Sequence, residues 1–140
     1  MNDRFFLDTN VFVYTFDAAA PAKRERAHDL VRTALSTGTG LISYQVIQEF
    51  LNVALRKFAT PLTSHDATAY LNTVLGPLCE VYPDRQLYES AIRLQEETGW
   101  SFYDSLIVSG ASRAGATTLY SEDLQSGRVL DRLTVVNPFV

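Results

Sequence analysis

Short apolar runs alternate with longer amphipathic segments along the whole chain, and this alternation limits the folds that the sequence can adopt. The apolar runs are too short for helices, so they predict buried strands. The expected strands lie at residues 4–7, 41–42, 80–82, 118–120 and 134–136. Strands separated by helices in this order are typical of an α/β fold, in which helices cover the faces of a parallel sheet.

The segments between these strands carry apolar residues three and four positions apart, which predicts amphipathic helices. The clearest one starts at Pro21, because proline favours a first helical turn, and stops at Gly38, because glycine favours a helix end. Ser43 and Ser64 are placed to cap the next two helices, and the Gly-Pro pair at 76–77 is expected to end the second of them. The expected helices lie at residues 21–37, 45–58, 64–75, 84–98 and 102–114, with a short helix or turn at 11–16.

The chain has 140 residues without an internal repeat, a low-complexity tract or a linker, so we expect a single domain spanning residues 1–140. Cys79 lies in an apolar stretch, which indicates a buried thiol and suits a reducing compartment. The apolar run before Asp8 is too short for a signal peptide, and no run reaches the roughly 18 residues of a membrane-spanning helix. We therefore expect a cytoplasmic protein without a membrane anchor.

Two acidic residues follow expected strands. Asp8 comes directly after the first strand, and Asp123 follows the strand at residues 118–120. Ligands of open α/β sheets bind beyond the carboxyl ends of the strands, so both carboxylates are expected to face that crevice if their strands are neighbours. The simpler alternative for Asp8 is a turn residue that bonds to its own backbone. Glu122 competes with Asp123 for the second position.

Two further acidic residues lie in expected helices. Glu49 borders the apolar stripe of its helix, three residues after Val46 and four before Val53, and taken by itself it fits a solvated surface charge better than a site residue. Asp104 lies three residues after Ser101 and before an apolar run, which is the pattern of a capping box. The capping alternative is compatible with a second role, because a carboxylate in a first helical turn can still point into a crevice.

The acidic residues at strand ends and helix starts indicate one shared metal site, formed by Asp8, Glu49, Asp104 and Asp123. Clustered carboxylates repel one another and are costly to bury, so a protein keeps them together when cations compensate their charge. Oxygen ligands of this kind suit Mg²⁺ or Mn²⁺. The formal net charge of −4 equals the charge of these acids, so the rest of the chain is neutral. His28 and His65 lie in polar helical surroundings and are expected at the surface.

Four motifs around these acids resemble those of the PIN-domain family, and within it the VapC-type toxins of bacterial and archaeal toxin–antitoxin pairs. They lie at residues 6–10, 43–50, 102–107 and 120–124, and in the last one a serine stands two residues before the acid. Each motif alone is loose, but all of them in order along the chain are specific. The resemblance implies a Rossmann-like PIN domain, with a central, mostly parallel sheet of four to five strands flanked by helices.

The resemblance also implies a Mg²⁺-dependent endoribonuclease, for which Mn²⁺ can substitute, that hydrolyses RNA phosphodiester bonds as the toxin of a VapBC-type pair. The metal-binding and catalytic acids that it implies are Asp8, Glu49, Asp104 and Asp123, with Asn10 and Ser121 as supporting polar groups. Its implied partners are the RNA substrate, a cognate VapB-like antitoxin and a second copy in a homodimer. The sequence leaves open which RNA is cut and whether a site holds one metal ion or two.

Two other functions compete with the nuclease. One is a PIN-like binding module without catalytic activity, and the intact acids argue against it. The other is a metal-dependent phosphatase with an aspartyl nucleophile, but residues 8–10 lack the second aspartate that such enzymes use. RNA binding also needs cations to contact phosphates. The candidates are residues 23–26, residues 56–57, Arg128 and Arg132, although a solvated helix face explains each of them equally well.

Overall fold

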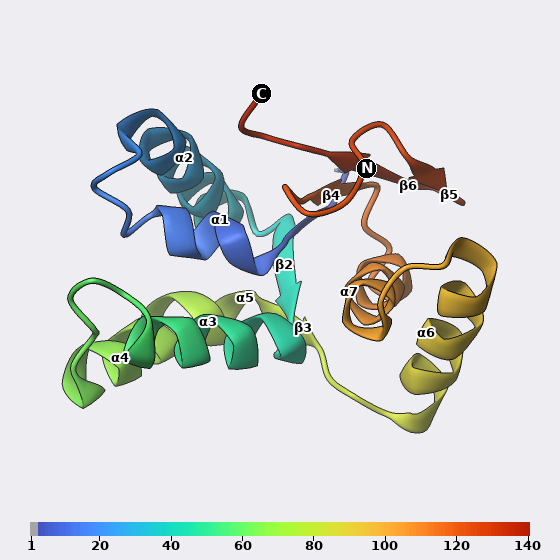
Figure 1. Cartoon of the computed structure of the whole chain (residues 1–140), viewed down its shortest axis with the longest axis horizontal. Coiled ribbons are helices and arrows are strands. Elements are labelled where there is room, and N and C mark those ends of the chain that lie inside the picture. The colour runs from blue at the N-terminus through green and yellow to red at the C-terminus, as the bar shows by residue number, and fades with distance from the viewer. Residues whose placement is uncertain (1–2) are drawn as a thin grey trace.

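A computed structural model describes residues 3–140 and contains a six-stranded sheet flanked by helices (Figure 1). The strands are β1 (Phe5–Leu7), β2 (Gly40–Ser43), β3 (Cys79–Val81), β4 (Thr118–Tyr120), β5 (Val129–Leu130) and β6 (Leu133–Val136). The helices are α1 (Thr9–Tyr14), α2 (Pro21–Thr37), α3 (Tyr44–Arg56), α4 (Ser64–Tyr70), the π-helical segment η1 (Leu71–Leu75), α5 (Gly76–Leu78), α6 (Arg85–Thr98) and α7 (Phe102–Arg113). The predicted α/β alternation is confirmed.

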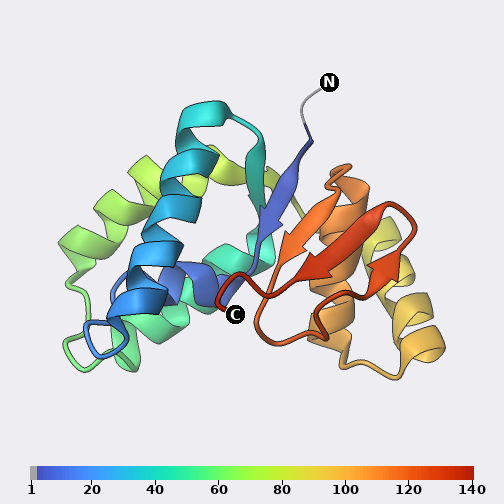
Figure 2. The ribbon, with the colours of Figure 1, turned by 90° about the horizontal axis from the view of Figure 1, so that it is seen from above.

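The strands follow the order β3-β2-β1-β4-β6-β5 across the sheet, and Figure 2 shows β2, β1, β4 and β6 side by side. Every neighbouring pair is parallel except β5 and β6, which form an antiparallel pair. The prediction of four to five strands was one strand too low. The additional strand, β5, has two residues, and Val129 is largely exposed, so this strand has no buried alternating pattern to detect in the sequence.

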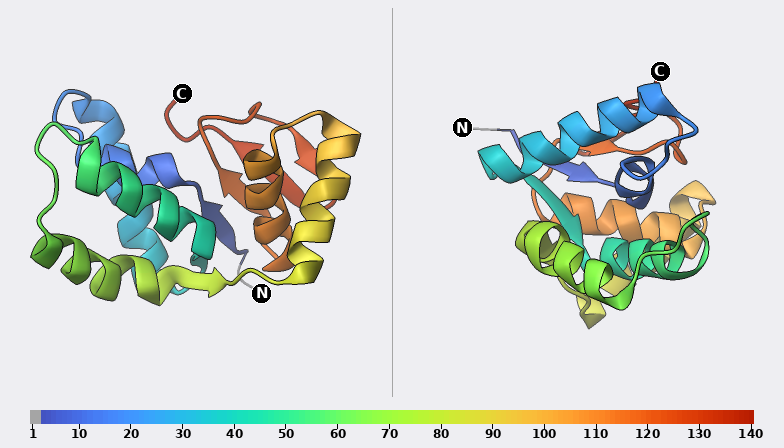
Figure 3. Two further views of the ribbon diagram at one scale, coloured as in Figure 1. Left: turned by 60° about the horizontal axis from the view of Figure 1, so that its bottom comes forward. Right: turned by 90° about the vertical axis from the view of Figure 1, so that its left-hand side faces the viewer.

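The helices form two groups on opposite sides of the molecule, with the central strands between them (Figure 3). Helix α1 packs against both α2 and α3, and α6 packs against α7. The first group consists of the helices between β1 and β3, from α1 to α5. The second group consists of α6 and α7, which connect β3 to β4. In residues 3–140, no helix is long and apolar enough to span a membrane.

Two helices have the ends that the sequence predicts. Helix α2 begins at Pro21 and ends at Gly38, whose φ of 71° is the left-handed conformation that glycine adopts without strain. The side chain of Asp84 accepts a hydrogen bond from the backbone N–H of Leu87 and so caps α6, which ends at Gly99. Local sequence signals are therefore sufficient to place these boundaries.

Other helix ends differ from the prediction. Ser43 precedes α3, but its hydroxyl makes no capping hydrogen bond. Thr63, not Ser64, caps α4 by accepting a hydrogen bond from the backbone N–H of Asp66. The prediction that the Gly-Pro pair at 76–77 breaks the helix was wrong, since η1 and α5 continue through it to Leu78. Pro77 lies in the first turn of α5, directly after the π-helical turn of η1.

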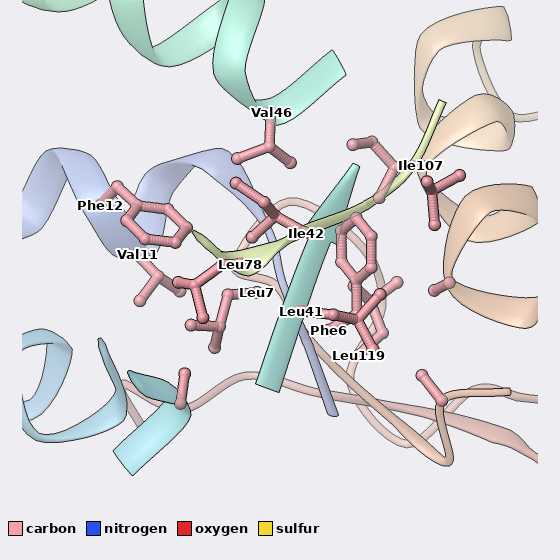
Figure 4. Packing of buried hydrophobic residues seen from close by; sticks show 14 of the residues in the cluster. Phe6, Leu7, Val11, Phe12, Leu41, Ile42, Val46, Leu78, Ile107 and Leu119 are labelled. Atoms are coloured by element: carbon pink, nitrogen blue, oxygen red, sulfur yellow. The ribbon is translucent and has the colours of Figure 1, made fainter. Parts of the chain in front are cut away.

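The core lies on both sides of the central strands (Figure 4). Phe6 and Leu7 of β1, Leu41 of β2 and Leu119 of β4 are fully buried, and Phe12 of α1 packs with them. Residues 5–7 and 41–42 accordingly appear in the sequence as continuous apolar runs, which is typical of strands buried on both faces. Cys79 is buried, and His28 and His65 are exposed, as predicted.

Candidate metal centre

The pairing of β1 with β4 brings two of the sequence motifs together. The strands are parallel, with Leu7 opposite Tyr120, and the backbone N–H of Asp8 donates to the carbonyl oxygen of Tyr120 over 3.0 Å. Asp8 and Ser121 therefore leave the sheet at the same edge. The structure thus places them where ligands bind in open parallel sheets.

Asp8 is buried and has two hydrogen-bond donors. It precedes α1 and accepts from the backbone N–H of Thr9 over 2.7 Å, so it does act as a helix cap. The hydroxyl of Ser121 donates to its other carboxylate oxygen over 2.8 Å. The alternative in which Asp8 bonds to nearby backbone is therefore confirmed, and the same capping residue also lines a cavity.

Glu49 is half-buried on α3 and is fixed by two neighbours. Its carboxylate accepts a hydrogen bond from the hydroxyl of Thr9 over 2.6 Å and one from the side-chain amide of Gln45 over 3.3 Å. Gln45 also donates to the carbonyl oxygen of Tyr103 over 3.0 Å and so connects α3 with α7. Glu49 is therefore not a free surface charge. Sequence reasoning missed Gln45, although its position four residues before Glu49 puts both on one helix face.

Asp104 and Asp123 complete the acidic set. The backbone N–H of Asp104 donates to the Ser101 hydroxyl over 3.1 Å, which confirms the predicted helix cap at α7. Both carboxylate oxygens of Asp123 accept from the side-chain amide of Asn10, over 3.0 and 3.1 Å. Asn10 therefore orients an acidic side chain that comes from a segment 113 residues away in the sequence.

All these acids line one cavity of about 270 Å³. Its lining residues are Asp8, Thr9, Asn10, Glu49, Asn52, Val53, Asp104, Ile107 and Asp123. Asn52 was not predicted from the sequence, although it lies only three residues after Glu49. Glu122 is not part of the lining, because its carboxylate bonds to Tyr14 and Lys23 outside the cavity. Asp123, not Glu122, is thus the residue that the last motif brings to the cavity.

The acids influence one another electrostatically. Burial raises the pKa of the Asp8 carboxyl from its ordinary value of 3.8 to about 6; hydrogen bonds from Ser121 and Thr9 oppose the increase, and the charges of Asp123 and Glu49 add to it. Burial also raises the pKa of Asp123, and the charge of Asp104 contributes. Repulsion of this kind is what a bound cation relieves.

The donors suit a hard cation. In residues 3–140, no three acidic, histidine or cysteine side chains converge closely enough to form a ready-made metal cluster. Hydrogen bonds instead hold Asp8, Glu49 and Asp123 around the shared cavity. Such a loose, oxygen-only arrangement fits Mg²⁺ or Mn²⁺, because these ions bind few carboxylates and keep several waters.

The model of the PIN domain family matches residues 5–130 of this chain. The chain belongs to the PIN-domain family. The match covers all the acidic positions described above and every strand of the sheet except β6. No curated protein sequence matches this PIN domain.

Solved structures resemble this PIN domain over most of its length. A toxin–antitoxin complex from Klebsiella pneumoniae has a TM-score of 0.70 at 16% identity, covering 96% of this chain and 97% of its own. DNA-bound VapBC from Salmonella typhimurium has a TM-score of 0.65 at 19% identity and the same coverage of both chains. Mycobacterium tuberculosis VapC20, a toxin that cleaves the sarcin–ricin loop, has a TM-score of 0.60 at 21% identity, covering 85% of this chain and 89% of its own. These likenesses establish a shared fold.

Proposed function

We propose that this PIN domain is a Mg²⁺-dependent endoribonuclease that hydrolyses RNA phosphodiester bonds as the toxin of a VapBC-type pair, with Mn²⁺ able to substitute. The observation that carries the proposal is the meeting of four carboxylates from distant motifs around one cavity in a PIN domain. The named toxins among the similar structures, including one that cleaves an RNA loop, support the same function.

In this proposal the acids Asp8, Glu49, Asp104 and Asp123 hold the cation. When bound, the cation would lower the pKa of a water molecule and neutralise charge on the phosphate. The side chains around the acids have an orienting function: Ser121 fixes Asp8, Thr9 fixes Glu49, and Asn10 fixes Asp123. Each of these hydrogen bonds orients a single carboxylate before a cation or substrate binds.

RNA contacts are proposed for the face of α3 that leads away from the cavity. Asn52 lines the cavity, and Arg56 lies one turn further along the same helix, followed by Lys57. Both basic side chains are exposed, and within residues 3–140 neither forms an ion pair. Lys23, by contrast, is paired with Glu122. Residues 56–57 are therefore a better choice for phosphate binding than residue 23.

The proposed partners are a second copy of the chain and a VapB-like antitoxin. Exposed aromatic side chains support the homodimer: Tyr44 and Tyr82 have ring centroids 6.3 Å apart, and Tyr88 lines the same small cavity as Tyr44. Light scattering of the purified protein measures its mass, and Tyr44→Glu is expected to shift a dimer toward monomers. A small neighbouring reading frame for a DNA-binding protein with an apolar tail would support the antitoxin.

The nuclease proposal is tested by incubating the purified chain with RNA and Mg²⁺ or Mn²⁺. We expect cleavage by the natural chain and none by Asp8→Asn or Asp104→Asn, because each change removes one proposed ligand charge. Chelation with EDTA is expected to stop the reaction. Cleavage that survives in both variants would show a contaminating nuclease, and a lack of cleavage by the natural chain would contradict the proposal.

A non-catalytic PIN module remains the competing function, and metal binding separates the two. Titration of the metal-free protein with Mn²⁺ in a calorimeter is expected to show binding that Asp8→Asn weakens at least tenfold, since the removed charge lies within the cavity. A module without a metal site would give no site-specific heat in either protein. Sequencing RNA ends after induction in cells, with Asp8→Asn as the reference, would identify the cleaved RNA.

A further inference from the structure

In the turn after β4, the side chain of Glu122 bonds to other partners than its two neighbours do. Ser121 and Asp123 serve the acidic cavity, as described above. Glu122, between them, accepts a hydrogen bond from the Tyr14 hydroxyl over 2.7 Å and forms an ion pair with Lys23, whose Nζ lies 3.0 Å from its carboxylate. The acid that does not enter the cavity is therefore bound on the other side of the turn.

Lys23 is itself held by aromatic side chains. Its Nζ lies 3.2 Å from the Tyr14 hydroxyl, 4.8 Å from the centre of the Tyr14 ring and 5.8 Å from that of Phe139. Contacts of this kind favour a cation over the ring face. We name the group formed by Tyr14, Lys23 and Glu122 the Glu122 clamp. It joins the end of α1 and the first turn of α2 to the turn that carries Asp123.

The turn has little support from its own backbone. The N–H of Ser121 donates to Val136 over 3.0 Å, and that of Gly127 donates to Val135 over 2.7 Å. Between them, no N–H of residues 122–126 donates to a backbone carbonyl in the described part of the chain. The position of Asp123 therefore depends on side-chain contacts on both sides of the turn.

The clamp also separates two neighbouring negative charges. The Glu122 carboxylate bonds to Tyr14 and Lys23. The carboxylate of Asp123 bonds to Asn10 and lines the cavity. The two adjacent carboxylates therefore lie on different sides of the turn, and that of Glu122 faces away from the cavity.

We infer that Lys23 and Tyr14 are positioning residues of the metal site. By holding Glu122 on the outer side of the turn, they place Asp123 at the cavity and keep the adjacent carboxylate out of it. This inference rests on the proposed function, because it concerns the same metal site. It assigns to Lys23 a role in metal binding, although its Nζ contacts no acid that lines the cavity.

The change Lys23→Met tests the clamp by the direction of its effect on Mn²⁺ binding. Simple electrostatics predicts tighter binding, because the change removes a positive charge near a cation site. Loss of positioning predicts weaker binding, and we expect about a tenfold increase in the dissociation constant, at the lower end of what outer-shell changes cost. Unchanged or tighter binding in a calorimetric titration would overturn the inference.

A double-mutant cycle shows whether Lys23 acts through Glu122. Glu122→Gln removes the ion pair from the other side. If Lys23 acts only by holding Glu122, the double variant with Lys23→Met binds Mn²⁺ no more weakly than Glu122→Gln alone. Additive losses in the double variant would instead show that the two residues act independently, which contradicts the clamp.

Arg32→Met is the matched control, because it removes one positive charge from the same helix and breaks only an exposed ion pair with Asp29. It is expected to leave Mn²⁺ binding unchanged. Hydrogen exchange of the metal-free proteins gives a second measurement: the hydrogen-bonded amides of Ser121, Asp123 and Gly127 are expected to exchange faster in Lys23→Met and not in Arg32→Met. If the natural chain binds no Mn²⁺, the proposed function fails. Equal hydrogen exchange in Lys23→Met and the natural chain would refute the clamp, whatever the outcome of the metal titration.

Discussion

The hydroxyl of Ser121 donates a hydrogen bond to the buried carboxylate of Asp8 over 2.8 Å and joins two motifs that lie 113 residues apart in the sequence. The Ser121 hydroxyl oxygen also accepts a hydrogen bond from the backbone N–H of Asp123 over 3.2 Å. One small polar side chain therefore connects two of the acids that we propose as metal ligands. The serine of the last motif therefore has a structural role, which is to link Asp8 and Asp123.

Ser121→Ala is expected to weaken Mn²⁺ binding about tenfold at pH 7, the usual cost of losing an outer-shell partner. The change leaves one Asp8 oxygen without its donor, and because that hydrogen bond lowers the pKa of Asp8, its loss raises the pKa further. Calorimetric titration measures the effect. Ser36→Ala is the control, since the exposed Ser36 hydroxyl donates to the carbonyl oxygen of Thr33 on α2. Equal losses in both variants would contradict the assigned role of Ser121.

The raised pKa of Asp8 predicts how the stability of the metal-free protein depends on pH. The folded-state pKa is about 6 against an ordinary value of 3.8, so the folded state holds this proton more tightly than the unfolded state. The resulting stability is complete below about pH 4 and is lost as the pH rises through 6. Asp8→Asn, which cannot ionise, is therefore expected to be about 1–3 kcal/mol more stable than the natural chain at pH 8, with EDTA present.

Urea unfolding at several pH values between 4 and 8 measures this difference. The advantage of Asp8→Asn is expected to disappear near pH 4, where the natural Asp8 is also neutral. Asp29→Asn serves as the control, because Asp29 is exposed on α2. A stability difference that does not change with pH would show that the ionisation of Asp8 is not its cause.

Thr9→Val is expected to lower Mn²⁺ affinity about tenfold, the lower end of the range for outer-shell partners. Valine matches the shape of threonine but cannot donate the 2.6 Å hydrogen bond that orients the Glu49 carboxylate. Thr9→Ser keeps the hydroxyl and is expected to restore most of the affinity. The same titration measures all three proteins, and a Val variant that binds as well as the Ser variant would exclude this orienting role.

Phe50→Ala is expected to cost about 3–5 kcal/mol of unfolding free energy, the usual range for removing a buried aromatic ring. Phe50 is fully buried on α3. The centre of its ring lies 6.4 Å from that of Phe12 and 5.0 Å from that of Tyr70. Urea denaturation measures the change. Val129→Ala, at a residue 60% exposed, is expected to stay within about 0.5 kcal/mol of the natural chain. Similar losses at both positions would contradict the packing assigned to Phe50.

Much of the fold follows from local patterns. The bounds of α2 and of β4 were predicted to the residue, because end signals and buried runs depend only on neighbouring residues. The helix through Gly76 was missed because its backbone approaches the carbonyl of Leu71 too closely for a side chain. A Cβ atom at that position would lie 2.9 Å from this oxygen, and only the folded chain reveals the contact.

The sequence by itself determined the alternating α/β order, the acidic positions and their family motifs, since these are properties of short segments. Only the tertiary structure decided that Thr9 holds Glu49, that Asp123 lines the cavity, and that Glu122 turns to Lys23 instead. The physical reason is distance along the chain. Hydrogen-bond partners 40 to 113 residues apart meet only after the strands have paired and the helices have packed.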